Sequence, residues 1–386
     1  MSVQTVGYGI IGCGMMGQEH IRNIALIPEA RVAAIFEPDE GMRSEGLRLA
    51  PGARAASSIA DLLGAADLHC VLIASPNFLH ISQLEEIAAI RPLPVLVEKP
   101  LFVDPADTRR LAALRERLPL LWVAMEYRYM PPVAKFIADA EDATGGIRML
   151  SIREHRYPFL HKIGNWNRFD RYTGGTFVEK GCHFFDLMRL ILKSNPVRIM
   201  ASGGQAVNHL AERCGEEAPD VWDHGYVLAD FENGTRSMLE LCMFAEGSRY
   251  QEELSAVGWD GKIECLVPGP TRFWSTNLGD PPVPRVIVSP RHPQGPRTLD
   301  IPVAPELLAL GDHNGSTFYQ HRRFNEALRG ERKVEATLDD GWWSVVMGLA
   351  AHRSAREGRA IELAGEFELP EERSSGSIPC AHQSLI

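Results

Sequence analysis

Residues 6–17 read Val-Gly-Tyr-Gly-Ile-Ile-Gly-Cys-Gly-Met-Met-Gly, an apolar strand that runs directly into a glycine-rich turn. The glycines have the spacing G-x-G-x-x-G, and a helical pattern follows from residue 18 to residue 26. In such a unit the first glycine makes the tight turn, the second lets the backbone approach a pyrophosphate, and the third lets the helix pack on the strand. The unpaired N–H groups at the helix start attract phosphate. We therefore expect a dinucleotide site at Gly12, Gly14, Met15, Met16 and Gly17.

An acidic residue stands where such a site needs one. A second apolar run, residues 31–36, ends at Glu37, twenty residues beyond Gly17. A carboxylate at this distance accepts hydrogen bonds from the adenosine ribose hydroxyls. We therefore add Glu37 to the expected cofactor site.

The pattern of the whole chain predicts two domains. Strands and helices alternate over residues 1–125, and the apolar strands lack strict alternation, which favours a parallel, doubly wound sheet. Residues 126–365 instead indicate a mostly antiparallel sheet with helices on one face. Its hairpin signals are Asn233-Gly234 and Asp260-Gly261, and it is expected to contain a helix over 176–193 and mostly loop over 268–315. We expect residues 366–386 to be a mobile tail.

Composition narrows the class of protein. The chain has 386 residues, 45% of them hydrophobic, and a formal net charge of −10, which argues against a nucleic-acid partner. No apolar run is long enough to span a bilayer. The seven cysteines are scattered, so we expect reduced thiols, a cytoplasmic location and no metal centre of zinc type.

Polar residues follow two of the expected strands. Glu98-Lys99-Pro100 ends the strand over 94–98, and Ser75-Pro76-Asn77 follows the strand over 67–74, with His80 one turn later. Ligands of open α/β sheets lie outside the carboxyl ends of strands. We therefore assign Ser75, Asn77, His80, Glu98 and Lys99 to the cofactor site. The Lys99 ammonium could also polarise a carbonyl or share a proton with a hydroxyl, especially with a pKa lowered by burial.

A polar stripe is expected on the helix over 176–193. Glu179, His183 and Asp186 fall at positions i, i+4 and i+7, and therefore on one face. An imidazole titrates near neutrality, and a carboxylate can orient it and hold its charge, so the stripe suits proton transfer.

A basic and aromatic loop over 158–173 suggests a carbohydrate site. Aromatic faces stack on sugar rings, and basic side chains can hold an anionic substituent. The expected substrate-binding residues, which include neighbours of this loop, are Tyr127, Arg156, Trp166, Arg168, Lys180, His183, Asp186 and His313.

Jointly these motifs resemble the Gfo/Idh/MocA family, the NAD(P)-dependent oxidoreductases that include glucose–fructose oxidoreductase and inositol dehydrogenases. The resemblance covers nearly the whole chain. It rests on Gly12-Cys-Gly14-Met-Met-Gly17, Ser75-Pro-Asn77-x-x-His80, Glu98-Lys99-Pro100 and Gly181-x-His183-x-x-Asp186. It implies a Rossmann domain, an open-faced sheet domain that builds homodimers or homotetramers, and a Lys99–His183 pair that flanks the reacting carbon. Glu179 stands where the family usually has Asp.

The leading hypothesis is an NAD-dependent dehydrogenase that oxidises a ring hydroxyl of a sugar, glycoside or polyol. Its catalytic residues are Lys99, His183 and Glu179. NAD is favoured over NADP because Pro38, and no arginine, follows Glu37. A second hypothesis is an NAD-dependent glycosidase acting on an anionic glycoside, such as a sulfonated sugar, by transient oxidation and elimination. Tyr127, Tyr157 or Tyr172 would then supply a second acid or base. A third is a non-catalytic NAD or sugar sensor.

Overall fold

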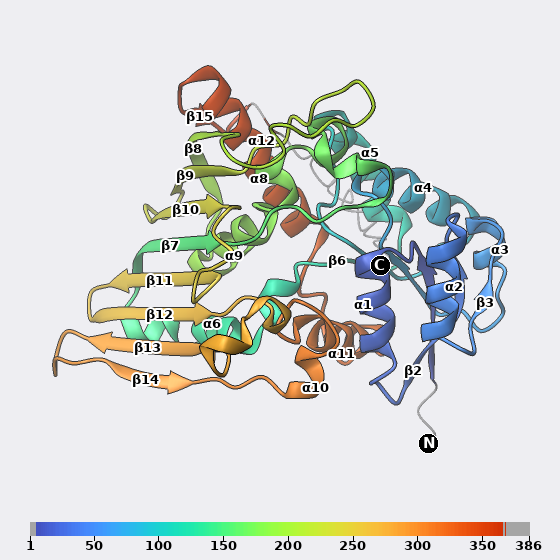
Figure 1. Ribbon diagram of the computed structural model, residues 1–386, viewed down its shortest axis with the longest axis horizontal. Coiled ribbons are helices and arrows are strands. Elements are labelled where there is room, and N and C mark those ends of the chain that lie inside the picture. The colour runs from blue at the N-terminus through green and yellow to red at the C-terminus, as the bar shows by residue number, and fades with distance from the viewer. Residues whose placement is uncertain (1–4, 366, 368–386) are drawn as a thin grey trace, which may run out of the picture.

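Two β-sheets with their helices build the computed structural model, which describes residues 5–365 and residue 367. Figure 1 shows the first sheet with its helices beside the broad second sheet. The tail expected over 366–386 lies, apart from residue 367, outside the described residues. Within the described part of the chain, no helix combines the length and the apolar character that crossing a membrane requires.

The first sheet has six parallel strands in the order β3-β2-β1-β4-β5-β6. Its central strands β1, β4 and β5 are buried along their whole length, as expected of a parallel sheet that is covered on both faces. The strand order reverses between β1 and β4, which opens a crevice at the carboxyl ends of the strands. Its elements are β1 (Val6–Ile11), α1 (Met15–Ile24), β2 (Ala30–Phe36), α2 (Glu40–Leu49), β3 (Arg54–Ala55), α3 (Ile59–Leu63), β4 (Cys70–Ile73), η1 (Asn77–Leu79), α4 (His80–Ile90), β5 (Val95–Val97), η2 (Pro105–Asp107), α5 (Thr108–Arg117) and β6 (Leu121–Val123).

The second sheet has nine strands in the order β14-β13-β12-β11-β7-β10-β9-β8-β15, and only the β7–β10 pair is parallel. This confirms the mostly antiparallel sheet. The elements of this part of the chain are η3 (Glu126–Tyr129), α6 (Pro131–Thr144), β7 (Ile147–His155), η4 (Ile163–Arg168), α7 (Asp170–Thr173), α8 (Thr176–Glu179), α9 (Cys182–Leu192), β8 (Pro196–Gly204), β9 (His224–Phe231), β10 (Arg236–Cys242), β11 (Glu252–Gly258), β12 (Gly261–Val267), η5 (Thr271–Phe273), η6 (Thr276–Leu278), β13 (Arg285–Pro290), β14 (Arg297–Asp300), α10 (Pro305–Leu308), α11 (Ser316–Leu328), α12 (Leu338–Glu357) and β15 (Ile361–Glu362).

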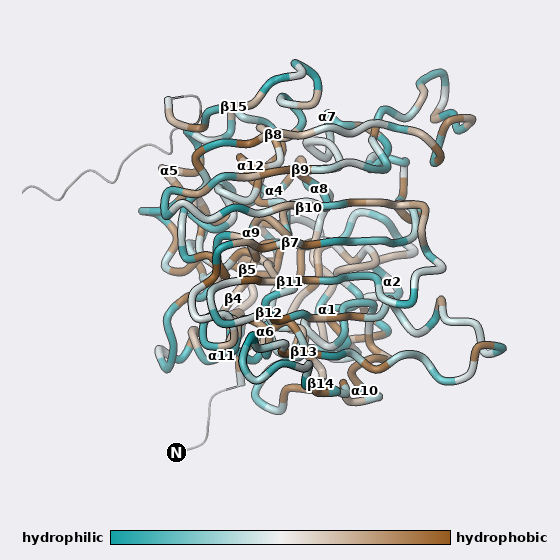
Figure 2. The backbone as a smooth tube through the Cα atoms, turned by 90° about the vertical axis from the view of Figure 1, so that its left-hand side faces the viewer, coloured by the Kyte–Doolittle hydropathy of each residue, from teal (hydrophilic) through white to brown (hydrophobic). Residues whose placement is uncertain are grey.

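Helices cover one face of this second sheet, and the other face is open. α6, α9 and α12 pack on the covered face, between the strands and the first domain (Figure 1). Residues on β8, β9 and β10 alternate between buried and accessible positions. Figure 2 looks onto the open face, where the nine strands lie one above another. The open-faced sheet predicted from the resemblance is therefore present.

Two local predictions differ from the structure. The helix expected over 176–193 is broken into α8 and α9. The Lys180 and Gly181 N–H groups both bond the Thr176 carbonyl, which widens the turn, and a Cβ on Gly181 would lie 2.3 Å from the Phe177 carbonyl oxygen. The stretch 268–315, expected to be mostly loop, contributes β13 and the short edge strand β14, because many of its prolines and glycines lie outside these two strands.

A buried ion pair fixes α9 against the neighbouring elements. Arg128 of η3 binds Asp186 of α9 with two N–H groups, one of them at 2.6 Å, and also bonds the Glu335 carbonyl. Its guanidinium lies 3.3 Å from Asp340 at the start of α12. Because both ions of the Arg128–Asp186 pair are buried, loss of one partner would leave an uncompensated charge.

Candidate active site

The glycine turn after β1 has the shape that a pyrophosphate needs. Gly12 has φ +94°, and a Cβ there would lie 2.6 Å from the Ser75 nitrogen. A Cβ on Gly17 would lie 2.2 Å from the Gly12 oxygen, whereas Gly14 faces open space. No side chain caps the start of α1, so its first N–H groups remain available to a ligand. Met15 is exposed and Met16 is half-buried beside them.

Glu37 lies beside this turn. Its Oε2 accepts the Cys13 N–H at 2.7 Å, and its Oε1 accepts the Asp39 N–H at 2.9 Å. The two bonds hold the carboxylate at the end of β2, next to the glycine turn. A ribose bound along the turn would meet this carboxylate, and so the residues present fit an NAD-type dinucleotide.

Two residues assigned to the cofactor site lie beneath it instead. His80 is fully buried and bridges the Ser75 and Pro100 carbonyls at 3.1 and 2.8 Å. Glu98 is buried against His20 at 2.8 Å. Both support the loops after β4 and β5 from inside, and their assignment to the cofactor site stays a prediction. Ser75 bonds Gln83 at 2.6 Å and is partly accessible.

Lys99 reaches from the end of β5 into the second domain. Its Nζ donates to the Glu179 carbonyl at 3.0 Å and lies 3.8 Å from the Glu179 carboxylate. Burial alone would lower the pKa of Lys99, but Glu179 and other nearby anions raise it above its ordinary value. The expectation of a lowered pKa was wrong, and at neutral pH Lys99 acts as a fixed positive charge.

His183 has the opposite character. It lies at the start of α9, and its ring stacks on the Tyr127 ring with centroids 4.1 Å apart. Burial, reinforced by the positive charges of Lys99 and Lys180, holds the pKa of His183 well below its ordinary value. Among the described residues its buried Nδ1 has no hydrogen-bond partner. A neutral, buried imidazole can accept a proton.

Glu179 supports the lysines and not the histidine. Its Oε2 accepts from the Asn77 side chain, and its Oε1 lies 3.8 Å from both Lys99 and Lys162. The break between α8 and α9 separates Glu179 from His183, so the single polar stripe predicted from the sequence does not form.

Asp186 also differs from its prediction. Its two carboxylate oxygens bind Arg128, and it has no hydrogen bond to His183 among the interactions of the described residues. Arg168 is likewise directed elsewhere, since its Nε donates to Glu212 at 3.0 Å and its side chain is buried. Both residues support the fold around the cleft.

The expected basic loop contacts the first domain through aromatic residues. Phe78 of the first domain lies 6.1 Å from the Trp166 ring and 4.9 Å from the Tyr172 ring. The Lys162 ammonium lies 4.4 Å from the centre of the Trp166 ring. Trp166 therefore contacts both domains at the cleft.

His313 is a half-buried cation near Tyr127. Its Nδ1 lies 2.8 Å from Glu19, and its Nε2 lies 3.5 Å from Glu126. Although burial would lower it, these carboxylates raise the pKa of His313 to about 10. His313 therefore carries its own positive charge between the two carboxylates, 6.2 Å from the Tyr127 ring.

A buried polar cluster behind Tyr127 includes residues that the sequence analysis missed. Lys180 contacts the Tyr127 hydroxyl at 2.6 Å and Glu154 at 2.9 Å. Glu154 stands directly opposite Glu252 in the β7–β11 register. Burial and the neighbouring Glu154 raise the pKa of Glu252 to about 7. The signal that could have found the pair is a glutamate on the otherwise apolar, inward face of each strand.

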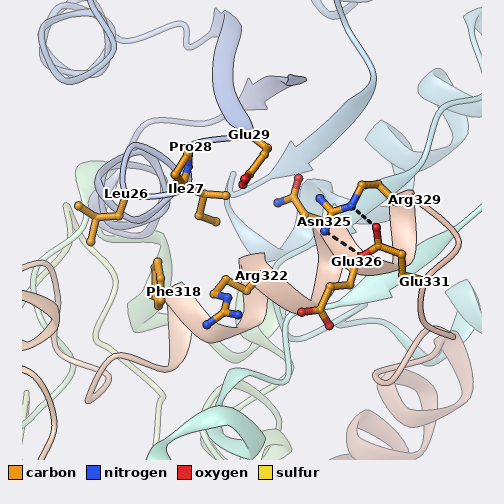
Figure 3. A pocket seen from close by; sticks show the side chains of 10 residues that line it. All are labelled: Leu26, Ile27, Pro28, Glu29, Phe318, Arg322, Asn325, Glu326, Arg329 and Glu331. Atoms are coloured by element: carbon orange, nitrogen blue, oxygen red, sulfur yellow. Dashed lines mark hydrogen bonds and ion pairs between the residues drawn. The ribbon is translucent and has the colours of Figure 1, made fainter. Parts of the chain in front are cut away.

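A pocket lies away from the candidate active site. It has a volume of about 460 Å³ and lies between the end of α1 and α11 (Figure 3). Its charged residues engage one another, as in the 2.7 Å pair between Arg329 and Glu331. None of the residues assigned above to catalysis or cofactor binding lines this pocket.

Comparison with known protein families matches both parts of the chain. Residues 6–126 match the model described as an oxidoreductase family with an NAD-binding Rossmann fold. Residues 141–363 match the C-terminal alpha/beta domain of the same oxidoreductase family. The two matches together span most of the described residues.

Individual relatives agree with these matches. The chain is 29% identical to inositol 2-dehydrogenase 2 of Saccharopolyspora erythraea, over 73% of this chain and 79% of that protein. The fold is similar to that of GenD2 from gentamicin A biosynthesis, solved with NAD. The TM-score is 0.76 and the identity 23%, over 94% of this chain and 97% of that chain. The fold is equally similar to that of levoglucosan dehydrogenase, solved with NADH and levoglucosan (TM-score 0.76, 20% identity, 94% and 100% coverage).

The Glu154–Glu252 pair predicts a pH-dependent stability. The pKa of Glu252 in the folded protein, about 7, lies above its ordinary value of 4.5. Its stabilising contribution is therefore complete below about pH 4.5 and is lost as the pH rises through 7, on the order of 3 kcal/mol in total. Because glutamine cannot lose this proton, we expect the free energy of unfolding of Glu252→Gln to fall less between pH 5 and pH 8 than that of the wild type.

Urea denaturation at several pH values measures this difference. The control is Glu253→Gln, which alters the neighbouring glutamate that pairs with Arg153 on the other face of β11. The interpretation fails if the wild type and both variants lose stability equally over this range.

Proposed function

Because this chain belongs to the Gfo/Idh/MocA oxidoreductase family, we propose that it is an NAD-dependent dehydrogenase that oxidises a ring hydroxyl of a sugar or polyol. The observation that carries the proposal is the contrast between two neighbouring groups in one cleft. The Lys99 ammonium is held by the Glu179 carbonyl at 3.0 Å, and the pKa of Lys99 is raised, whereas the pKa of His183 is lowered, so a charged ammonium and a neutral imidazole lie near each other. In the oxidation of an alcohol, the imidazole can accept the hydroxyl proton and the ammonium can stabilise the developing oxyanion.

The roles of the residues follow from their protonation. His183 accepts the hydroxyl proton, and the stacked Tyr127 ring fixes the plane of the imidazole. The Lys99 ammonium stabilises the negative charge that develops on the substrate oxygen, and Glu179 holds this ammonium in place. NAD, when bound at the glycine turn, supplies the oxidant that takes up the hydride from carbon. Glu179 is thus a positioning residue in this proposal.

The glycosidase and the sensor remain as alternatives with less support. The relatives described above that carry an enzyme name are dehydrogenases, and none is named a glycosidase. A sensor has no need of the Lys99 and His183 pair. The readouts below separate all three possibilities.

The assay combines purified protein, NAD and a panel of myo-inositol, levoglucosan, aldoses and aryl glycosides, and records NADH absorbance and aryl release together. We expect NADH to form with at least one sugar or polyol. We further expect Lys99→Ala to lower kcat by about 10²–10³-fold, because it removes the charge that stabilises the developing oxyanion. The affinity for NADH, followed by fluorescence titration, should stay nearly unchanged.

Lys135→Ala is the control, since Lys135 pairs with Asp139 on the surface of α6 and should keep the wild-type rate. A Lys99→Ala enzyme with a near wild-type rate contradicts the assignment. NAD-dependent release of the aryl group without accumulation of NADH would instead support the glycosidase.

For the cofactor, we propose NAD rather than NADP. The Glu37 carboxylate is held beside the glycine turn, where it would accept bonds from the ribose and repel a 2′-phosphate. We expect a lower KM for NAD than for NADP. Glu37→Gln should raise KM for NAD about tenfold or more, because charge-assisted bonds are lost, and should reduce the discrimination against NADP.

Steady-state kinetics with both cofactors measures this preference. Glu40→Gln, in the exposed first turn of α2, should behave as the wild type. Equal use of NADP by the wild type would contradict the role of Glu37.

We also propose that residues 126–365 serve for substrate binding and for homo-oligomer formation, while residues 1–125 bind the cofactor. The open sheet face carries exposed apolar side chains, including Met200, Tyr226 and Leu228. An apolar surface of this kind favours burial against a second copy. Light scattering should give a dimer or tetramer for the wild type and for Ile90→Glu, a control in the first domain, but a smaller species for Leu228→Glu. A monomeric wild type would contradict this proposal.

A further inference from the structure

We propose that the substrate of this site carries an oxyanion, such as the carboxylate of a sugar acid, which is bound by Arg156 and Lys162. The inference rests on the proposed dehydrogenase function and deepens it. Both side chains enter the cleft region from the segment between β7 and η4. Both side chains are partly exposed, and among the described residues their terminal N–H groups have no hydrogen-bond acceptor.

Arg156 presents a pre-organised fork. Its Nε donates to the Tyr157 carbonyl at 3.1 Å, and its guanidinium lies 4.3 Å from the centre of the Tyr157 ring. Tyr157 packs in turn on Phe273, with ring centroids 4.5 Å apart. The nearest carboxylate, Glu154, is 3.8 Å away, which is too far for a hydrogen bond. The two terminal nitrogens are therefore free for a bidentate acceptor.

Lys162 is a second cation without a hydrogen bond. It lies over the Trp166 ring and 3.8 Å from Glu179. Burial lowers the pKa of Lys162, Glu179 raises it, and repulsion from Lys99 and Arg156 lowers it further, so that it lies below the ordinary value. Lys162 and Arg156 come from one short segment, and each lies 3.8 Å from a carboxylate that a second cation shares. An anion near both would relieve the repulsion between like charges.

The charges of the cleft favour an anionic ligand. Lys99 and Lys162 share the Glu179 carboxylate, and Lys180 and Arg156 share Glu154. Each carboxylate is thus shared by two cations, so neither Lys162 nor Arg156 has a carboxylate of its own. An anion bound beside a cation that shares its carboxylate would compensate the positive charge further.

The developing alkoxide does not account for Arg156 and Lys162. Lys99 already supplies an ammonium for one oxygen, and the planar Arg156 fork matches two oxygens on one atom better than a single alkoxide. The cofactor pyrophosphate does not account for them either, because its place is the glycine turn at the start of α1. What remains is an oxyanion on the substrate itself.

The test compares matched pairs of neutral and anionic sugars in the glucose, galactose and mannose series, with glucose 6-phosphate and glucose 6-sulfate added. We expect kcat/KM for at least one anionic member to exceed that of its neutral partner by about 100-fold. Arg156→Met and Lys162→Met should each remove most of this preference, measured as the ratio of kcat/KM for the anionic to the neutral member of a pair, and Arg156→Lys should restore part of it. The anionic sugar with the largest increase in kcat/KM over its neutral partner shows whether the site prefers a carboxylate, a phosphate or a sulfate.

Arg153→Met is the matched control, because Arg153 lies on β7, three residues before Arg156, but pairs with Glu253 on the open face. Neutral sugars that are oxidised as well as their anionic partners would overturn the inference and leave the dehydrogenase function intact. If no sugar is oxidised, calorimetric titration of the NADH-loaded protein with the same acids decides separately. Binding that Arg156→Met abolishes supports the anion site, and the absence of binding overturns it.

Discussion

The contacts of one carboxylate hold the cleft together. Glu179 of the second domain accepts from Asn77, faces Lys99 and lies near Lys162. Asn77 and Lys99 follow the neighbouring strands β4 and β5 of the first sheet. The Glu179 side chain therefore connects the crevice at the ends of these strands to the α8–α9 segment of the second domain. Without the negative charge of Glu179, the Lys99 ammonium would lie beside other cations, and the pKa of Lys99 would no longer be held high. The same α8–α9 segment positions His183, two residues beyond Gly181.

The charges around Lys99 and His183 give these two groups different protonation states. Anions close to Lys99 keep it charged, whereas burial, reinforced by nearby cations, keeps His183 neutral. Burial alone would favour the neutral form of both groups, so the difference comes from their immediate neighbours. The cluster of Lys180, Glu154 and Glu252 behind Tyr127 belongs to the same field. A small change in any member is therefore expected to affect groups that it does not touch.

The sequence predicted the features that depend on local patterns. The glycine turn, the strand ends at Asn77 and Lys99, and the hairpins at Asn233-Gly234 and Asp260-Gly261 follow from nearby residues. The prediction failed where distant residues decide. Asp186 turns to Arg128, which lies 58 residues away, and not to His183. The break of the helix over 176–193 at Gly181 is a local feature, a wide turn closed on Thr176, that the helical pattern did not reveal. The Glu154–Glu252 pair arises only from strand register, which sequence spacing does not reveal.

The parallel β7–β10 pair has a consequence for the order in which the chain acquires its structure. β7 ends at His155, yet its two neighbours in the sheet, β10 and β11, begin only at Arg236 and Glu252. During synthesis the first sheet can close from residues that are near in sequence, whereas β7 must wait for partners made much later. Such non-local pairing slows folding. The first domain is thus expected to be formed while the central strand of the second is still unpaired.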